Sequence, residues 1–198
     1  MTTVTSSTPV AVRLRFGTSA AHAQLEARLD LLGPTLTRER YRRLLERLHG
    51  FHAVLEPRLD AWHARDPVLD WPARRKLGLL AADLADLHRG HPGNLPRCPD
   101  VPEVENTARA LGVLYVVEGA TLGGTLIAAH LRDTDVPTGA LRFFSCYGDQ
   151  VGRRWRRWRQ ATDTWVGADP ARSDAVVESA TETFTVLARW LAPAGVVR

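Results

Sequence analysis

The chain has 198 residues, of which 44% are hydrophobic and 24% are charged. This length and composition fit a globular domain with a sizeable core and exclude a low-complexity, disordered protein. The net charge of +4 is carried almost entirely by arginine, and we interpret it as a solvated surface rather than a nucleic-acid interface.

The chain begins with a polar segment that lacks the basic start and apolar centre of a signal peptide. We predict that residues 1–11 form a disordered tail and that residues 12–198 form one domain. No apolar run looks long enough to cross a bilayer, so no membrane segment is expected. Cys98 and Cys146 stand in unrelated surroundings, which favours a reducing, cytoplasmic location.

Helical periodicity starts near Thr18, which is a candidate N-cap for a helix to about Leu32 that Gly33-Pro34 ends. A second helix is expected over 38–63, with Pro57 bending it. Its apolar residues keep helical spacing throughout: Tyr41, Leu44, Leu45, Leu48, Phe51, Leu55, Leu59 and Trp62.

Pro72 opens a third predicted helix, and the Gly- and Pro-rich residues 89–102 form a connecting loop. Further helices are expected over about 103–131, 149–166 and from Asp169-Pro170 to about Leu191, with a loop over 133–148. No alternating strand pattern or internal repeat is present. The predicted fold is therefore all-α, a single-domain helical bundle.

Gly119, Gly123 and Gly124 interrupt an otherwise strong helical pattern. Each glycine costs a helix about 1 kcal/mol relative to alanine, so three of them need a reason. Their spacing places them on nearly one face. Either another helix packs closely there, or a flat ligand lies directly on the backbone.

His22 is expected to point inward with Leu25 and Leu29, and Glu26 follows one turn later. A carboxylate at Nδ1 would leave Nε2 free to bind a metal. An inward histidine beside a glutamate is also a common hydrogen-bonded core pair, so the residues alone leave both interpretations open.

A second metal-site hypothesis is a carboxylate–histidine centre at Glu46, His49, His52 and Glu56. A di-iron site needs a second Glu-x-x-His, which is absent from the sequence, so a helix-surface cluster explains these residues better. The remaining histidines have no ligand spacing and are expected to be solvated or capping: His63, His88, His91 and His130.

Taken together, the segments RLRFGTSAAHAQLEARLDLL and LGVLYVVEGATLGGTLI resemble the proximal and distal helices of haem oxygenases. FFSCYGDQVGRRWRRW resembles the stretch that follows in the bacterial branch associated with bacteriophytochromes. The resemblance extends from about Arg13 to Leu191 and implies the haem oxygenase fold.

The resemblance implies an enzyme that uses O2 to open haem b, both cofactor and substrate, to biliverdin, CO and ferrous iron. His22 would be the axial ligand, oriented by Glu26, and Gly119, Gly123 and Gly124 would line the opposite, distal side. It also implies an electron donor such as a ferredoxin or reductase, and a bacteriophytochrome as a partner that receives biliverdin. No nucleic-acid partner is expected.

Haem propionates need cations, and the resemblance assigns this role to Arg15, with Arg154 as a weaker candidate. Tyr115 either faces the haem edge or fills the core. Ala120 stands where mammalian-type relatives have an aspartate that organises distal water, so Thr121 or Thr125 would join a water relay. Glu118 is expected to pair with an arginine rather than replace that acid.

The missing acid keeps one alternative open, a haem sensor, carrier or store that binds haem through His22 without turning it over. A helical nucleic-acid binder remains a further alternative, but no DNA-binding motif supports it.

Overall fold

The computed structural model describes residues 9–33, 36–88 and 94–192. Within these ranges the regular elements are α1 (Val10–Leu29), α2 (Arg38–His63), η1 (Trp71–Arg74), α3 (Leu77–His88), α4 (Thr107–Arg132), η2 (Thr138–Ala140), η3 (Gly148–Gln150), α5 (Val151–Val166) and α6 (Pro170–Leu191). The predicted all-α fold class is confirmed.

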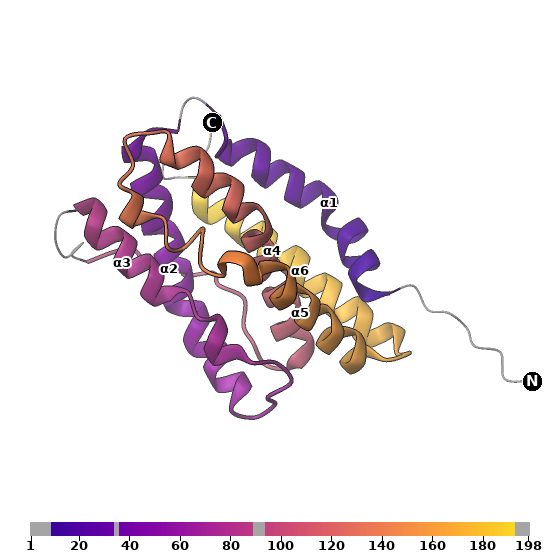
Figure 1. Cartoon of the computed structure of the whole chain (residues 1–198). Helices are drawn as coiled ribbons and strands as arrows, with labels where there is room; N and C mark the ends of the chain where they lie inside the picture. Colours follow the sequence, from indigo (N-terminus) through magenta and orange to yellow (C-terminus); the bar gives the residue numbers. More distant parts are fainter. Residues whose placement is uncertain (1–8, 34–35, 89–93, 193–198) are drawn as a thin grey trace, which may run out of the picture.

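Helices α4 and α6 form the central pair of the bundle, and their contact is the most extensive one between any two elements. Helix α1 lies along α6 at one side of the bundle, whereas α2 and α3 pack together at the other side (Figure 1). Apolar side chains fill the spaces between these helices in two large clusters. This arrangement leaves α1 in contact mainly with α6 and, less, with α5.

Helix α1 begins at Val10, eight residues before the predicted cap. Val10, Leu14 and Thr18 are spaced by four and form its buried face, and the Thr18 hydroxyl donates to the Leu14 carbonyl at 2.8 Å. Burial against the bundle thus outweighs the capping preference of threonine. Residues 10 and 11 of the predicted tail are helical, and residues 1–8 lie outside the described residues.

Three other helices show how local signals set boundaries. Helix α2 has the predicted bounds, and its apolar stripe is buried apart from the half-buried Leu48. Asp169 caps α6 by accepting the backbone N–H of Ala171 at 2.9 Å. Asn106 caps α4 by accepting the backbone N–H of Arg109 at 3.0 Å, so α4 begins at residue 107 rather than near 103.

Helix α4 is apolar enough to resemble a membrane span. Among the described residues it is the one helix whose length and mean hydropathy, 1.6 over an 18-residue window, satisfy that test. This corrects the expectation that no such run exists. However, 56% of the window is buried inside the bundle, as is usual for the core helix of a globular domain.

The three glycines of α4 do not share one face, which corrects the sequence interpretation. Successive helical residues turn by about 100°, so Gly124 lies well away from the direction shared by Gly119 and Gly123. A Cβ atom at Gly124 would come 2.3 Å from the carbonyl oxygen of Phe144. Close backbone packing therefore explains Gly124, whereas a Cβ at Gly123 would meet no atom of the described residues within 4 Å.

His52 and Glu56 are buried in α2, contrary to the expected helix-surface cluster. His52 Nδ1 lies 3.1 Å from Glu56 Oε1, and that oxygen also accepts the backbone N–H groups of Lys76 and Leu77 at 2.7 and 2.8 Å. Glu56 therefore accepts two backbone N–H groups at the start of α3 that have no partner within the helix. Burial lowers the pKa of His52 by disfavouring its charged form.

We predict opposite effects on stability from alanine at two neighbouring glycines. Gly124→Ala should lower the free energy of unfolding by about 1–3 kcal/mol, because the added methyl group meets backbone that cannot yield easily. Gly123→Ala should raise it by up to about 1 kcal/mol, because alanine favours the helix and has space. Urea unfolding of both variants measures this difference, and equal effects would contradict the assigned packing.

We also predict that acid weakens the fold through His52. An unfolded imidazole titrates near 6.5, so between about pH 7 and pH 5 the unfolded chain binds more protons than the folded protein. The free energy of unfolding should therefore fall as the pH decreases. His52→Gln should reduce this slope in urea titrations, although the half-buried His49, whose pKa burial also lowers, retains part of it. An unchanged slope would contradict the assignment.

Candidate functional site

His22 lies on the flank of α1 rather than on its buried face. Its side chain is 51% exposed, which corrects the expectation that it points inward. The reason is that Val10, Leu14 and Thr18 define the buried line, and His22 is one further step of four along a helix that drifts by about 40° per step. The imidazole is therefore accessible to a ligand.

Glu26 stands beside His22 as predicted. His22 Nδ1 lies 3.3 Å from Glu26 Oε2, and the Glu26 side chain is 70% exposed. No hydrogen-bond partner for Nε2 is present among the residues that the structure describes. The imidazole therefore has one nitrogen beside a carboxylate and the other available as a metal ligand.

Phe184 of α6 links His22 to α4. Its ring meets the His22 imidazole edge-on with centroids 5.5 Å apart, and it meets the Tyr115 ring edge-on at 6.5 Å. Tyr115 also packs against Trp155 and Trp158 of α5, at 5.7 and 5.5 Å. Tyr115 is thus a half-buried member of an aromatic cluster that reaches from α5 to His22.

The face of α4 that follows Tyr115 carries almost no covering side chains. Gly119 and Gly123 lie one turn apart on it, and among the described residues only the Trp155 ring, at 3.8 Å, would touch a Cβ atom at Gly119. Leu122 and Leu126 beside them are 43% and 64% exposed. Exposed leucines beside bare backbone form an apolar surface with space above it, which suits a flat apolar ligand.

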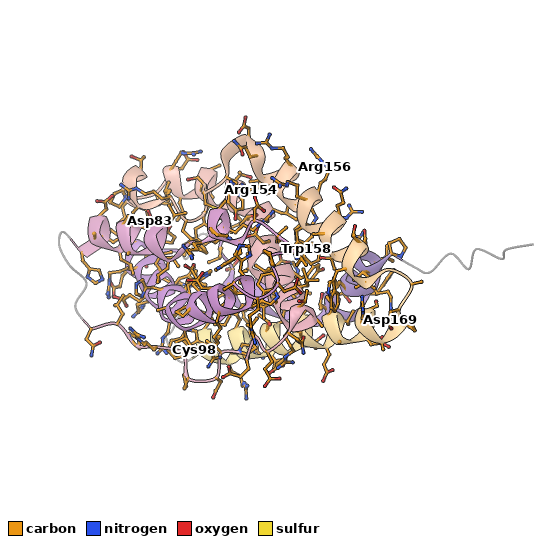
Figure 2. The ribbon with its side chains drawn as sticks, turned by 90° about the horizontal axis from the view of Figure 1, so that it is seen from below. Asp83, Cys98, Arg154, Arg156, Trp158 and Asp169 are labelled. Atoms are coloured by element: carbon orange, nitrogen blue, oxygen red, sulfur yellow. The ribbon has the colours of Figure 1, made fainter. Side chains whose placement is uncertain are left out.

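The two predicted cations have different surroundings. Arg15 is exposed on α1. Arg154 of α5 is already held by neighbouring elements, because its Nη1 donates to the Ala73 carbonyl at 2.9 Å and its guanidinium lies 4.5 Å from the centre of the Tyr147 ring. Figure 2 shows Trp158 directed into the bundle, whereas Arg156 points outward from the same helix.

Ala120 and the residues near it differ in their exposure to solvent. Ala120 and Thr125 are exposed, whereas Thr121 is buried and donates to the Glu118 carbonyl at 2.6 Å. Glu118 turns into the protein and forms ion pairs with Arg74 and Lys76. The prediction that Glu118 pairs with an arginine is confirmed.

The competing carboxylate–histidine centre does not form. Glu46 forms an ion pair with Arg42, and its Oε1 lies 3.0 Å from His88 Nε2. His52 and Glu56 pair with each other, and Glu56 accepts backbone N–H groups at the start of α3. In the described part of the chain no group of three or more His, Cys, Asp or Glu side chains is arranged to hold a metal ion. His91 lies outside the described residues.

A surface hollow of about 690 Å³ lies elsewhere, between the segment 100–103, the start of α4 and α6. Its lining includes Arg109 and Glu182, which pair with each other, and none of the predicted site residues. Charge pairing within its wall makes it a poor candidate for catalysis, and no metal-ligand set is present among the described residues.

Sequence reasoning missed several residues of this region. Phe184 is one of them, because its contact with His22 depends on how α1 lies on α6 and not on local spacing. Leu122 and Leu126, at i and i+4 on the glycine-bearing face, were a readable signal of an apolar surface. An arginine partner for Glu118 was predicted, but nothing in the local pattern identifies Arg74, Lys76 or Tyr147.

The arrangement fits a planar, metal-centred ligand. An exposed imidazole supplies one available nitrogen, and a nearby helix offers backbone with space above it and leucines at its sides. Haem has this combination of an iron that accepts an imidazole and a flat apolar ring.

Comparison with known proteins shows the family of this chain. The family model described as Heme oxygenase matches residues 8–193. A heme oxygenase of Xanthomonas campestris pv. campestris is 31% identical over 137 residues, which cover 69% of this chain and 79% of that protein.

Solved structures share the fold. The NO- and CO-bound heme oxygenase from Neisseria meningitidis has a TM-score of 0.79 at 20% identity and covers 95% of this chain and 92% of its own. Heme oxygenase-2 from Synechocystis, in complex with heme and NO, has a TM-score of 0.74 at 19% identity and covers 94% of this chain and 85% of its own. Since the family model spans nearly the whole chain, this protein belongs to the haem oxygenase family.

Proposed function

We propose that this protein binds haem between α1 and the glycine-bearing face of α4 and cleaves it with O2 to biliverdin, CO and ferrous iron. Its family assigns it to the haem-degrading oxidoreductases. The observation that carries the proposed site is the half-exposed His22 imidazole, joined through Phe184 to the helix that bears Gly119 and Gly123. Haem b supplies both the iron that activates O2 and the ring that is opened.

His22 would hold the iron through Nε2. Glu26, at 3.3 Å from Nδ1, would keep the proton on Nδ1 and so leave Nε2 unprotonated for the metal. Because Glu26 is 70% exposed, this orientation is weaker than a buried carboxylate would provide.

The bare backbone of α4 would lie close to the haem ring and so restrict the position from which bound O2 attacks it. Gly119 and Gly123 leave space for a ligand, and Leu122 and Leu126 would cover its apolar edges. Gly124 would act indirectly, because it packs against Phe144 rather than facing this space. Tyr115 would support the site through its contact with Phe184.

Cations at the mouth of the site would bind the two propionates. Arg15 is exposed on α1 and retains its assignment, and a guanidinium can bind a carboxylate with two hydrogen bonds. Arg154 is a weaker candidate because binding would require it to leave the Ala73 carbonyl or to share its remaining N–H groups.

Proton delivery would depend on water. Ala120 is exposed and has no side-chain donor, and the Thr121 hydroxyl is committed to the Glu118 carbonyl. Thr125 is exposed, but it lies about 160° around the helix from Gly123. Water ordered by the α4 backbone would therefore deliver the proton. In mammalian-type relatives an aspartate organises this water.

The same Ala120 position supports the alternative of a haem carrier or sensor. Haemin, O2 and a reductant separate the two functions: loss of the Soret band with biliverdin absorbance shows an enzyme, and a persistent ferrous–oxy spectrum shows a binder. Electrons would come from a ferredoxin or reductase, a bacteriophytochrome would receive biliverdin, and the location would be cytoplasmic.

We predict that His22→Ala abolishes biliverdin formation while the protein remains folded, because an exposed ligand is removed from an intact helix. Absorbance during turnover and circular dichroism measure the two effects. His63→Ala, which removes a half-buried histidine from the end of α2, is the matched control and should retain activity. Normal biliverdin production by His22→Ala would exclude His22 as the ligand.

We further predict that Gly123→Leu weakens haemin binding by at least about tenfold, because the side chain fills the space above the backbone. Gly78→Leu on α3 is the control, since a Cβ atom at Gly78 also meets none of the structurally described atoms within 4 Å. Haemin titration followed at the Soret band compares the two variants. Wild-type affinity in Gly123→Leu would show that haem does not lie on this face.

A further inference from the structure

Four polar side chains meet beneath α4, on the side turned away from the open glycine face. Arg74 comes from η1, Lys76 from the segment before α3, Tyr147 from the residue before η3, and Glu118 from α4 itself. Arg74 is 0% exposed, and Lys76 and Glu118 are each 1% exposed. We call these four residues the Glu118 hub.

The polar side-chain atoms of the Glu118 hub form hydrogen bonds with one another and with nearby backbone. The Glu118 carboxylate accepts from Arg74, from Lys76 and from the Tyr147 hydroxyl, the last at 2.9 Å. Lys76 Nζ also donates to the Arg74 carbonyl at 3.1 Å and to the Tyr147 hydroxyl at 3.2 Å. One carboxylate thus ties two separate stretches, residues 74–76 and Tyr147, to α4.

The charges in the Glu118 hub are balanced. Two buried cations face one buried carboxylate, and Asp70, 2.9 Å from Arg74 Nε, provides the second negative charge. A buried charge that loses its partner is strongly unfavourable, so residues 74–76, Tyr147 and α4 cannot separate without a large cost in free energy. Burial raises the pKa of Tyr147 and keeps its hydroxyl protonated as a donor.

A second contact holds α4 six residues further on. The Phe144 carbonyl packs against the bare backbone of Gly124. The loop that carries Phe144 is held by buried Asp83 of α3, which accepts the backbone N–H groups of Arg142 and Phe143 at 3.0 and 2.8 Å. The same loop continues to Tyr147, so it contacts both ends of the 118–124 segment.

These two contacts bracket the open backbone. Glu118 and Gly119 are adjacent and point about 100° apart, so a side chain fixed in the hub sets the direction of the next residue. Gly119 and Gly123 lie between the Glu118 contact and the Gly124 contact. Since glycines give this segment little side-chain packing of its own, its position has to come from its neighbours.

We infer that the Glu118 hub is a positioning element that holds the α4 backbone at Gly119 and Gly123 in place relative to His22. This role rests on the proposed function, because the position of Gly119 and Gly123 matters only if haem binds against them. The hub residues do not touch that ligand; they act through α4. Loss of a hub bond should therefore loosen the 119–124 segment and change how a ring is oriented against it.

Hydrogen exchange of the haem-free protein tests the hub directly. Tyr147→Phe removes one hydroxyl from the hub with little change in volume, and Glu118→Gln removes the central charge while keeping the shape. Thr107→Val is the control on the same helix, because Thr107 is buried and accepts the Trp62 indole N–H at 3.1 Å, three turns before Glu118.

We expect the amides of residues 119–124 to exchange at least about tenfold faster in Tyr147→Phe, while those of residues 110–116 change little. Thr107→Val should not produce this local pattern. If Glu118→Gln fails to fold, the exchange rates of Tyr147→Phe alone test the inference. Uniform acceleration along α4, or no acceleration, would overturn the inference because a merely stabilising hub protects the whole helix.

The same variants loaded with haemin give a second readout. A displaced α4 should change the ratio of biliverdin isomers in Tyr147→Phe but not in Thr107→Val, and a wild-type ratio in Tyr147→Phe would also overturn the positioning role. Failure of the wild-type protein to take up haemin would contradict the proposed function instead. In that case the exchange pattern still decides whether the hub holds α4.

Discussion

The proposed site depends on the contacts that Phe184 makes with two helices at once. Its ring meets His22 on α1 and Tyr115 on α4, and α1 has its main contact with α6, the helix that carries Phe184. The separation between the imidazole and the glycine-bearing backbone is therefore set through α6. An aromatic ring suits this role because its shape is fixed and it resists compression.

Bare backbone and buried charge have complementary roles in α4. One side of the helix lacks side chains at Gly119 and Gly123, which leaves space but forfeits helix stability and packing. The other side carries Glu118, whose bonds to Arg74, Lys76 and Tyr147 hold the helix from beneath. We consider the second feature to be the compensation for the first.

Local patterns predicted much of the fold and part of the site. The apolar stripe of α2 and the Asp169-Pro170 start of α6 act within a few residues, so they could be read directly. The predicted start of α1 at Thr18 was wrong, because burial, a tertiary effect, decides where this helix begins. Gly124 and the partners of Glu118 depend on segments distant in the chain, and no periodicity in a single sequence reveals those contacts.

Resonance Raman spectroscopy of the ferrous haem complex tests the central claim most directly, because it detects the bond between the iron and an axial imidazole. We predict an iron–imidazole stretching band that shifts in protein labelled with ¹⁵N-histidine and is missing from His22→Ala. A wild-type complex without this band, or a band that persists unchanged in His22→Ala, would contradict the assignment of His22 and the site built around it.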